Sequence, residues 1–425
     1  MNYPLWDVPV IGGGILIAII SIIHVFISHF AVGAGVFNVL TERMARRARD
    51  AALLAFVRRH SFVLLLVSMV VGALTGVGIW FAIGLVHPTG TSALIHVFVW
   101  AWAIEWIIFV VEVVTAFVYV YGWDRLPPQI HQRIGWMYAV SSWLSLFVIN
   151  GILTFMLTPG EWLATRDVWD AFFNPTFWPS LVLRTLVALA LAGLVTLLLS
   201  TLQTDDVLRE RFVTYTAQWV LYPLIGMIPA GFWYIAQLPQ DVARWFEGSS
   251  APLTMFFMLS ALFTGLILAV LLFAALRQPR HFTWPVALLI MFFGLLATAS
   301  TEMVREAIRR PFLIRDYLYS NAVRVDEVES INRTGILAHA RWVPVRQVTP
   351  ETVRQAGQAV FDVQCRICHT IHGFNGIAAL TATWREETMY AFLGHMHEVK
   401  PFMPPFLGTD AERRALAAWI VSLQQ

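Results

Sequence analysis

The sequence predicts an all-α membrane protein: a bundle of about eight transmembrane helices followed by a small all-α domain outside the membrane. Of its 425 residues, 58% are hydrophobic and only 13% are charged, and the mean hydropathy is +0.66. Soluble domains are about half apolar and about a quarter charged, so most of the chain is predicted to lie in a lipid bilayer. The net charge of +2 argues against a nucleic-acid partner.

The apolar residues fall into eight stretches, each long enough for a bilayer span of about 20 residues. The stretches cover approximately residues 10–40, 61–86, 93–121, 135–158, 180–202, 213–236, 252–276 and 283–304. No cleavable signal peptide is expected, because the first stretch is too long and the residues before it are neutral to acidic. Residues 1–320 are therefore predicted to form the membrane domain.

Arginine residues are divided unequally between the two sets of loops. One set holds twelve of them: Arg43, Arg46, Arg47, Arg49, Arg58, Arg59, Arg125, Arg133, Arg209, Arg211, Arg277 and Arg280. The alternate loops hold only Arg166 and Arg244. Cytoplasmic loops are enriched in basic residues, so the sequence predicts a multi-pass protein of the bacterial cytoplasmic (inner) membrane. Its N-terminus and everything beyond about residue 305 are then expected on the outer, periplasmic side.

The polar C-terminal part contains the sequence QCRICHTIHGF. Here Cys365, Cys368 and His369 form C-x-x-C-H, the pattern for covalent attachment of one c-type haem, with His369 as an axial iron ligand. Such a haem is attached outside the cytoplasmic membrane, in agreement with the arginine distribution. Residues 321–348 are predicted to be an extended linker, and residues 349–425 a small haem c domain.

A second axial ligand is expected further along the chain. Met403, in an M-P-P turn, precedes an amphipathic helix that Asp410 or Thr409 would cap. This layout resembles a class I cytochrome c, in which a thioether ligand raises the haem potential. His395 and His397 are the alternative ligands. His372 is expected to be a surface residue.

Ionisable residues inside predicted spans are costly and usually functional. Those of this chain are His24, His29, Glu105, Glu112, Arg184, Glu302, Arg305 and Glu306. Glu105 and Glu112 are seven residues apart and share one helix face. Arg305 is spaced to neutralise a carboxylate of its own helix. The set predicts a cofactor or proton site, and satisfied hydrogen bonds between helices are the alternative.

Residues 1–320 resemble subunit I of cytochrome bd oxidases. The similarity rests on IHVFISHFAVGAG, GALTGVGIWFAIG, AIEW with YGWDRL, and LSLFVINGILTFMLTP in the first four spans, and on EAIRRPF after the eighth. The resemblance implies that His24, Glu105 and Glu306 hold a high-spin haem b and a haem d (or a second haem b) where oxygen is reduced. It further implies that Arg309 pairs with a haem propionate, and that a second membrane subunit of the subunit II type is a partner.

The chain also departs from the family pattern. The second glutamate of the third span falls on Val113, so either Glu112 beside it substitutes for that glutamate or the proton route differs. The low-spin haem b needs a histidine where this chain has Arg184, although Met258 could match its methionine. That haem is therefore expected to be absent or differently ligated.

Two further departures concern the route by which electrons enter. The loop AQLPQDVARWFEGSSAP is too short for the family's quinol-binding loop, and the haem c domain stands in place of a ninth span. The sequence therefore predicts a terminal oxidase in which a periplasmic cytochrome c or copper protein reduces haem c and Glu105, Glu112 and Glu306 serve oxygen reduction. The alternatives are an electron-transfer subunit that serves a partner or an acceptor other than oxygen, and a non-catalytic anchor or sensor that presents haem c.

Overall fold

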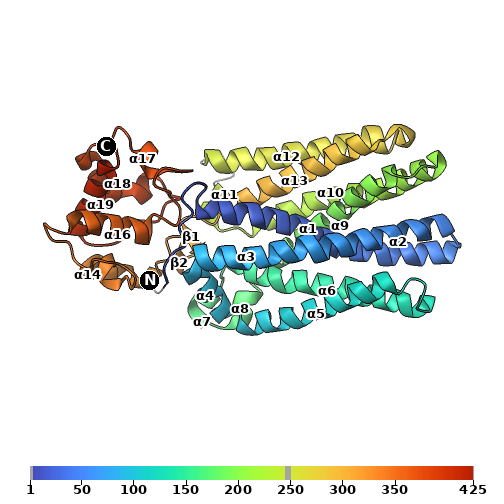
Figure 1. Cartoon of the computed structure of the whole chain (residues 1–425), viewed down its shortest axis with the longest axis horizontal. Coiled ribbons are helices and arrows are strands. Elements are labelled where there is room, and N and C mark those ends of the chain that lie inside the picture. Colours follow the sequence, from blue (N-terminus) through green and yellow to red (C-terminus); the bar gives the residue numbers. More distant parts are fainter. Residues whose placement is uncertain (1–2, 245–249, 425) are drawn as a thin grey trace.

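In the computed structural model, which describes residues 3–244 and 250–424, eight helical spans run side by side along the long axis (Figure 1). They are α1 (Gly13–Ala48), α2 to α3 (Ala51–Val86), α5 (Val99–Tyr121), α6 (Pro128–Phe155), α9 (Phe177–Thr201), α10 (Asp206–Ala236), α12 with η3 (Ala251–Ala275) and α13 (Trp284–Ala307). The predicted all-α fold with eight spans is confirmed.

The second span is built from three helical segments. A π-helical segment, η1 (Val67–Gly72), separates α2 (Ala51–Leu66) from α3 (Ala73–Val86). The span begins about ten residues before the apolar stretch that predicted it, because Asp50 caps α2 by accepting a hydrogen bond from the Leu53 N–H at 3.0 Å. The additional turns carry Arg58 and Arg59 beyond the apolar part of the helix.

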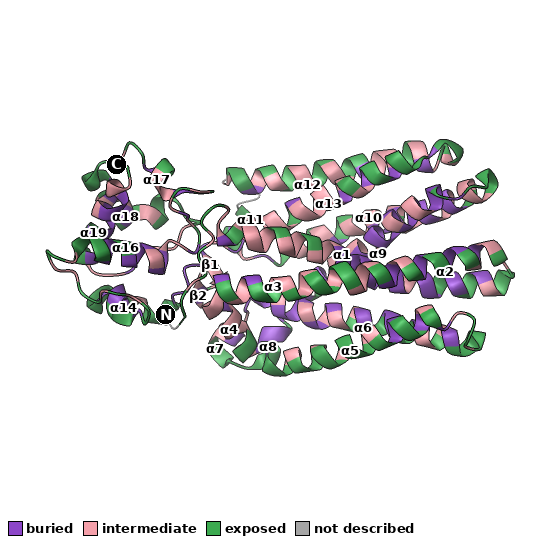
Figure 2. Ribbon diagram, in the orientation of Figure 1, coloured by how far each residue is buried: buried purple, intermediate pink, exposed green. Residues whose placement is uncertain are grey.

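In the bundle, buried and exposed residues lie on different sides of the same helices (Figure 2). Phe30 and Ala34 of α1 and Leu191 and Leu194 of α9 lie in one buried apolar cluster. The outward sides expose large apolar residues, for example Trp100 at 76%. Exposed apolar surface on this scale is typical of helices that face lipid.

α1 and α9 approach each other closely at a glycine. A Cβ atom at Gly33 would collide with the carbonyl group of Ala188, so only glycine permits this packing distance. From Ile27 onward, α1 lies largely inside the bundle.

Short elements and the C-terminal domain gather at one end of the bundle, and the predicted cytoplasmic, arginine-rich loops lie at the other (Figure 1). The short elements are α4 (Pro88–Val97), α7 (Trp162–Thr165), α8 (Val168–Phe172), α11 (Gln240–Arg244) and an antiparallel hairpin of β1 (Phe312–Ile314) and β2 (Leu318–Tyr319). η4 (Pro279–His281) belongs to a loop at the arginine-rich end.

The C-terminal domain is built around α16 (Val353–Gln364), α18 (Glu386–Val399) and α19 (Asp410–Ser422), with a short α17 (Ile377–Leu380). The rings of Phe361 on α16 and Trp419 on α19 pack with centroids 4.9 Å apart. Thr409 is the residue that caps α19, and the Glu412 side chain completes the capping box.

The predicted linker, residues 321–348, is partly helical. It contains η5 (Val325–Glu327), α14 (Val328–Thr334) and α15 (Ile336–His339). Ile331, Ile336 and Leu337 are buried in the same apolar cluster as α16 and α19. The segment thus packs as part of the C-terminal domain.

Candidate active site

His24 of α1 is held by a hydroxyl group of the neighbouring helix α3. Its Nδ1 lies 3.1 Å from Oγ1 of Thr75, and that hydroxyl donates its own proton to the Val71 carbonyl at 2.7 Å. The Thr75 oxygen must therefore accept a hydrogen bond from the Nδ1–H of His24. This fixes the tautomer in which Nε2 is free to bind a metal, the usual arrangement for a ligating histidine.

Gly76 leaves space beside the His24 ring. A Cβ atom at this position would lie 3.1 Å from Cε1 of His24. The GALTG sequence that carries Thr75 and Gly76 thus both orients the ring and gives it room.

Two carboxylates lie on one face of α5. Glu105 accepts a hydrogen bond of 2.9 Å from the Ser145 hydroxyl of α6. Glu112, two turns further along α5, is within electrostatic range of Glu105. The predicted shared face is present, and the two carboxylates are close enough to influence each other's charge.

Glu306 lies in the last turn of α13 between two arginines. Its Oε1 is 2.8 Å from Nη2 of Arg310, and its Oε2 pairs with Arg309. Arg309 is buried, and among the described residues its Nε–H has no hydrogen-bond partner. An unpaired buried donor is costly, so this position fits an additional anionic group such as a haem propionate.

A different arrangement occupies the position of the expected low-spin haem. Arg184 lies within electrostatic range of Glu302, which Arg305 binds at 2.6 Å as its spacing predicts. A guanidinium keeps its proton and does not ligate iron. The side chain of Met258 is on the surface of α12, at 65% exposure. Arg184 therefore does not fit the histidine ligand of such a haem, and Met258 as its methionine ligand stays a prediction.

In the C-terminal domain, the C-x-x-C-H residues begin at Cys365, the C-cap residue of α16. Cys365 and Cys368 are free thiols. The Nδ1–H of His369 donates to the Asn375 carbonyl at 3.0 Å, which leaves Nε2 available. Burial lowers the pKa of His369, so the ring is neutral near pH 7 and able to ligate.

Met403 has two contacts that hold its turn. Its N–H donates to the Lys400 carbonyl at 2.8 Å, and its own carbonyl accepts from Nδ1 of His397 at 2.7 Å. His395 is exposed and pairs with Glu398 at 3.2 Å. His397 therefore supports the Met403 turn, and Met403 as the second iron ligand stays a prediction.

The C-x-x-C-H motif faces the membrane domain. Nη1 of Arg310, which binds Glu306 with its other nitrogen, lies 3.4 Å from Sγ of Cys368. The N-terminal segment makes a second contact, because Arg366 binds Asp7 at 2.7 Å. One arginine thus connects the two predicted haem sites.

The backbone of the N-terminal segment also binds the haem c domain. The Phe374 N–H donates to the Val10 carbonyl at 2.8 Å. Sequence reasoning had assigned no role to Arg310, Thr75 or Ser145. The run of arginines in EAIRRPF was the available signal for Arg310, whereas isolated hydroxyl residues gave none.

No three His, Cys, Asp or Glu side chains among residues 3–244 and 250–424 converge on a point that could hold a bare metal ion. The predicted ligands stand singly on separate helices. Haem iron takes one or two protein ligands of this kind.

The family described as "Cytochrome bd terminal oxidase subunit I" matches residues 15–234, and that described as "Cytochrome C oxidase, cbb3-type, subunit III" matches residues 352–420. No curated protein matches the sequence significantly. A solved structure, "The structure of bd oxidase from Geobacillus thermodenitrificans", has the same fold with a TM-score of 0.63 at 15% identity. The match covers 75% of this chain and 92% of that one.

Proposed function

The chain belongs to the cytochrome bd terminal oxidase subunit I family, and we propose that it is a cytochrome c:oxygen oxidoreductase subunit rather than a quinol oxidase. It accepts electrons from a periplasmic cytochrome c or copper protein through covalent haem c and passes them to haem in the membrane domain, where oxygen is reduced to water. The chain is a multi-pass membrane protein of an oxidoreductase family, and it carries a cytochrome c domain that binds haem.

The contact of Arg310 with both Cys368 and Glu306 is the observation that carries the proposal. Cys368 is a haem c attachment site, and Glu306 belongs to the predicted membrane haem site. A single side chain that reaches both groups supports two neighbouring haem sites at the proposed outer face. Electron transfer between two haem groups requires a short distance between them.

In the membrane domain, bound haem would supply the iron that binds and reduces oxygen. His24, with its tautomer set by Thr75, and the carboxylates of Glu105 and Glu306 are the proposed iron ligands. Arg309 would hold a propionate with its unpaired Nε–H. Glu105 and Glu112 would deliver protons to the same region, since carboxylates can accept and release them.

The connection between α10 and α12 supports donor entry through haem c instead of quinol. Its described part contains the short helix α11, and Asp241 of that helix binds Arg315 at 2.6 Å. Residues 245–249 of this loop lie outside the described residues. The described part of this loop is bound to the segment after α13 through the Asp241–Arg315 ion pair. It does not form a long quinol-binding loop.

The second candidate is a relay that passes electrons to a partner or to an acceptor other than oxygen. The ionic group of Arg184, Glu302 and Arg305 favours it, because it stands where the family places a low-spin haem b. In both cases we propose a second membrane subunit of the subunit II type as partner.

Oxygen uptake by the purified, haem-replete protein tests the proposal. We expect uptake with reduced cytochrome c or an artificial high-potential donor, and none with a short-chain quinol. A Cys365→Ala, Cys368→Ala double variant should lose the donor-driven uptake while keeping its membrane haem. Uptake with quinol would contradict the proposed donor, and no uptake with either donor would favour the relay.

A further inference from the structure

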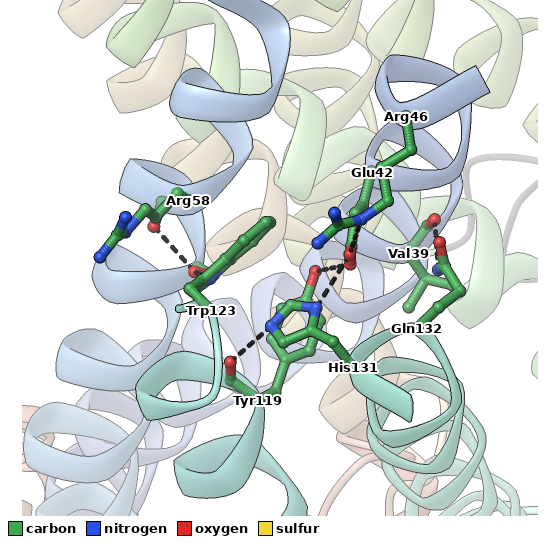
Figure 3. Close-up of polar contacts among 9 residues, drawn as sticks. Val39, Glu42, Arg46, Arg58, Tyr119, Trp123, His131 and Gln132 are labelled. Carbon is green, nitrogen blue, oxygen red and sulfur yellow. Dashed lines mark hydrogen bonds and ion pairs between the residues drawn. The ribbon is translucent and has the colours of Figure 1, made fainter. Parts of the chain in front are cut away.

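A buried polar cluster lies at the end of the bundle that carries the arginine-rich loops (Figure 3). Its centre is Glu42, near the inner end of α1, which is completely buried. Oε1 of Glu42 lies 2.6 Å from Nε of Arg46 and 2.8 Å from Nδ1 of His131. Oε2 accepts a hydrogen bond of 2.9 Å from the Tyr119 hydroxyl. Three helices, α1, α5 and α6, thus contribute to one site.

The hydrogen bonds of His131 fix the number of protons at this site. Nε2 of His131 lies 2.9 Å from the Tyr119 carbonyl, which can only accept, so Nε2 carries a proton. The Nδ1 atom faces the Glu42 carboxyl oxygen, and a second proton must lie between these two atoms. Without this proton, the lone pair of Nδ1 would face the negative charge of the carboxylate, and the two acceptor atoms would repel each other. The Glu42–His131 pair therefore holds one transferable proton in a defined position.

The cluster is covered on its inner side by an aromatic ring. Trp123 packs against His131 with ring centroids 4.3 Å apart, and its Nε1–H donates to the Ser61 hydroxyl at 2.9 Å. The next residue, Asp124, is exposed at the surface and binds Arg58. Trp123 and the Glu42-bound Arg46 are both partly exposed, so the proton-holding pair lies close to the surface at this end of the bundle.

From this cluster, polar residues lead outward in a regular pattern on two antiparallel helices. On α5 they are Tyr119, Glu112 and Glu105, and on α6 they are His131, Tyr138 and Ser145, all at intervals of seven residues. A spacing of seven keeps each set on one helix face. The two sets pair in order: Tyr119 contacts His131, Glu112 is within electrostatic range of Tyr138, and Glu105 accepts a hydrogen bond from Ser145.

Two further hydroxyl groups lie beside this ladder of three pairs. Thr115 is one turn from Glu112 and one turn from Tyr119 on the same face of α5, and it is buried. The hydroxyl oxygen of Ser68, in the π-helical segment η1, is buried beside Tyr138 and has no hydrogen-bond partner of normal geometry among the described residues. A buried hydroxyl without a partner is a position that ordered water commonly occupies.

We propose that the Glu42–His131 pair is the proton-loading site on the inner side of the membrane, and that it feeds the ladder that ends at Glu105. The inference rests on the proposed function, which consumes protons near Glu105. When a proton leaves the pair, the Tyr119 hydroxyl accepts one proton and releases another toward Thr115 and Glu112. A proton from the inner aqueous phase then replaces the one lost, so the pair returns to its original charge.

The test is proton uptake by the purified protein in liposomes of known orientation, with a pH-indicating dye on the inner-face side. It compares wild type with Glu42→Gln and Tyr119→Phe during a single turnover that starts from the reduced protein and oxygen. We expect both variants to slow proton uptake by about tenfold or more. Electron transfer from haem c, followed by its absorbance, should keep its rate.

Thr41→Val is the matched control. Thr41 precedes Glu42 on α1, is equally buried, and shares its hydroxyl with Tyr215 at 2.8 Å instead of with the cluster. It should take up protons at the wild-type rate. If Glu42→Gln fails to fold, Tyr119→Phe still tests the proposed loading site, because this variant keeps the aromatic ring and loses only the hydroxyl group. Wild-type proton uptake in a folded Tyr119→Phe or Glu42→Gln variant would overturn the proposal.

The same experiment separates this proposal from the proposed function. If wild type shows no oxygen uptake, the proposed function fails, and proton uptake on anaerobic reduction of the haems then tests the loading site by itself. If wild type reduces oxygen but the two variants take up protons normally, only the loading site is wrong.

Discussion

The Arg310 guanidinium lies 3.4 Å from Sγ of Cys368 and also binds the Glu306 carboxylate. Cys368 belongs to the haem c domain and Glu306 to the last turn of a membrane helix, so this contact crosses the boundary between the two domains. A cation at this position favours the reduced state of a nearby haem, because reduction adds a negative charge. Arg310 is therefore placed to affect both the potential of haem c and the alignment of the two sites.

Replacing Arg310 with glutamine should lower the midpoint potential of haem c, on the order of tens of millivolts. The change also removes one of the two cations that bind Glu306, so internal electron transfer from haem c should slow. Redox titration and stopped-flow absorbance measure the two effects. Arg315→Gln is the control, since Arg315 binds Asp241 on the same outer face without contacting the motif. An unchanged potential in Arg310→Gln would contradict this role.

Replacing His24, or the threonine that hydrogen-bonds to it, should weaken haem binding in the membrane domain. His24→Ala should lose one membrane haem per chain, and Thr75→Val should reduce haem affinity by about tenfold or more, because the hydroxyl that fixes the tautomer is gone. Pyridine haemochrome quantification after purification measures both. Thr298→Val is the control, since the Thr298 hydroxyl of α13 binds only its own helix, at Gly294. Full haem content in His24→Ala would exclude His24 as a ligand.

The eight spans could be predicted because hydropathy depends on the sequence alone. The bounds of the helices could not be predicted, since a helix such as α2 extends beyond its apolar stretch where a cap such as Asp50 satisfies one of its first N–H groups. The packing of residues 321–348 was also not predictable. Their polar composition predicts a linker, whereas Ile331, Ile336 and Leu337 are buried only because α16 and α19 provide a partner surface.

For the site, residue type and spacing identified the intramembrane carboxylates but not their partners. Glu42 was missed because it follows the end of the predicted first span, where a carboxylate is expected to face water. His131 was missed for the same reason at the start of the fourth. The available signal was the interval of seven that connects Glu105 and Glu112 with Tyr119, which becomes meaningful only when α6 is known to lie beside α5.

The second ligand of haem c can be tested by comparing Met403→Leu with His397→Gln. Met403→Leu should lower the midpoint potential and remove the near-infrared charge-transfer band of a thioether–iron bond, because leucine cannot ligate. His397→Gln should keep the band, since His397 contributes a hydrogen bond to the Met403 carbonyl. The opposite pattern, with the band retained in Met403→Leu, would exclude Met403.

His87 gives the end of the bundle beside the C-terminal domain a defined pH dependence. Its Nε2–H donates to the Ser320 carbonyl at 3.1 Å and its Nδ1 accepts from the Gly90 N–H at 3.2 Å, so the neutral ring uses both nitrogens. Burial lowers the pKa of His87 from 6.5 to about 4. The folded state therefore binds this proton more weakly than the unfolded state. The stabilisation is fully present above pH 6.5 and is lost as the pH falls toward 4.

Amide hydrogen exchange of residues 312–324 measures this effect. Protection should decrease between pH 6.5 and 4 in the wild type, after correction for intrinsic exchange. His87→Gln should show lower protection at neutral pH and a flatter pH dependence. An equal pH dependence in both proteins would mean that another group titrates.

Glu412 should be the residue on which the stability of the haem c domain depends most directly. This buried carboxylate accepts hydrogen bonds from the Ile336, Leu337 and Thr409 N–H groups at 3.0, 2.9 and 2.9 Å. It thus joins the segment after the hairpin to α19. Glu412→Gln keeps the shape but offers one accepting oxygen, so at least one buried N–H loses its partner. We expect a loss of about 1–3 kcal/mol in the free energy of unfolding of this domain.

Denaturant unfolding of the full-length protein, followed by haem c absorbance, measures the effect of Glu412→Gln. Glu398→Gln is the matched control on the same domain, because Glu398 is exposed and pairs only with the exposed His395. Exposed ion pairs contribute little, so this variant should unfold at the wild-type denaturant concentration. If the two variants shifted the midpoint equally, the hydrogen bonds of Glu412 would not be what fixes residues 336–340 against α19. The packing of Ile336 and Leu337 in the apolar cluster would then be sufficient to hold the segment.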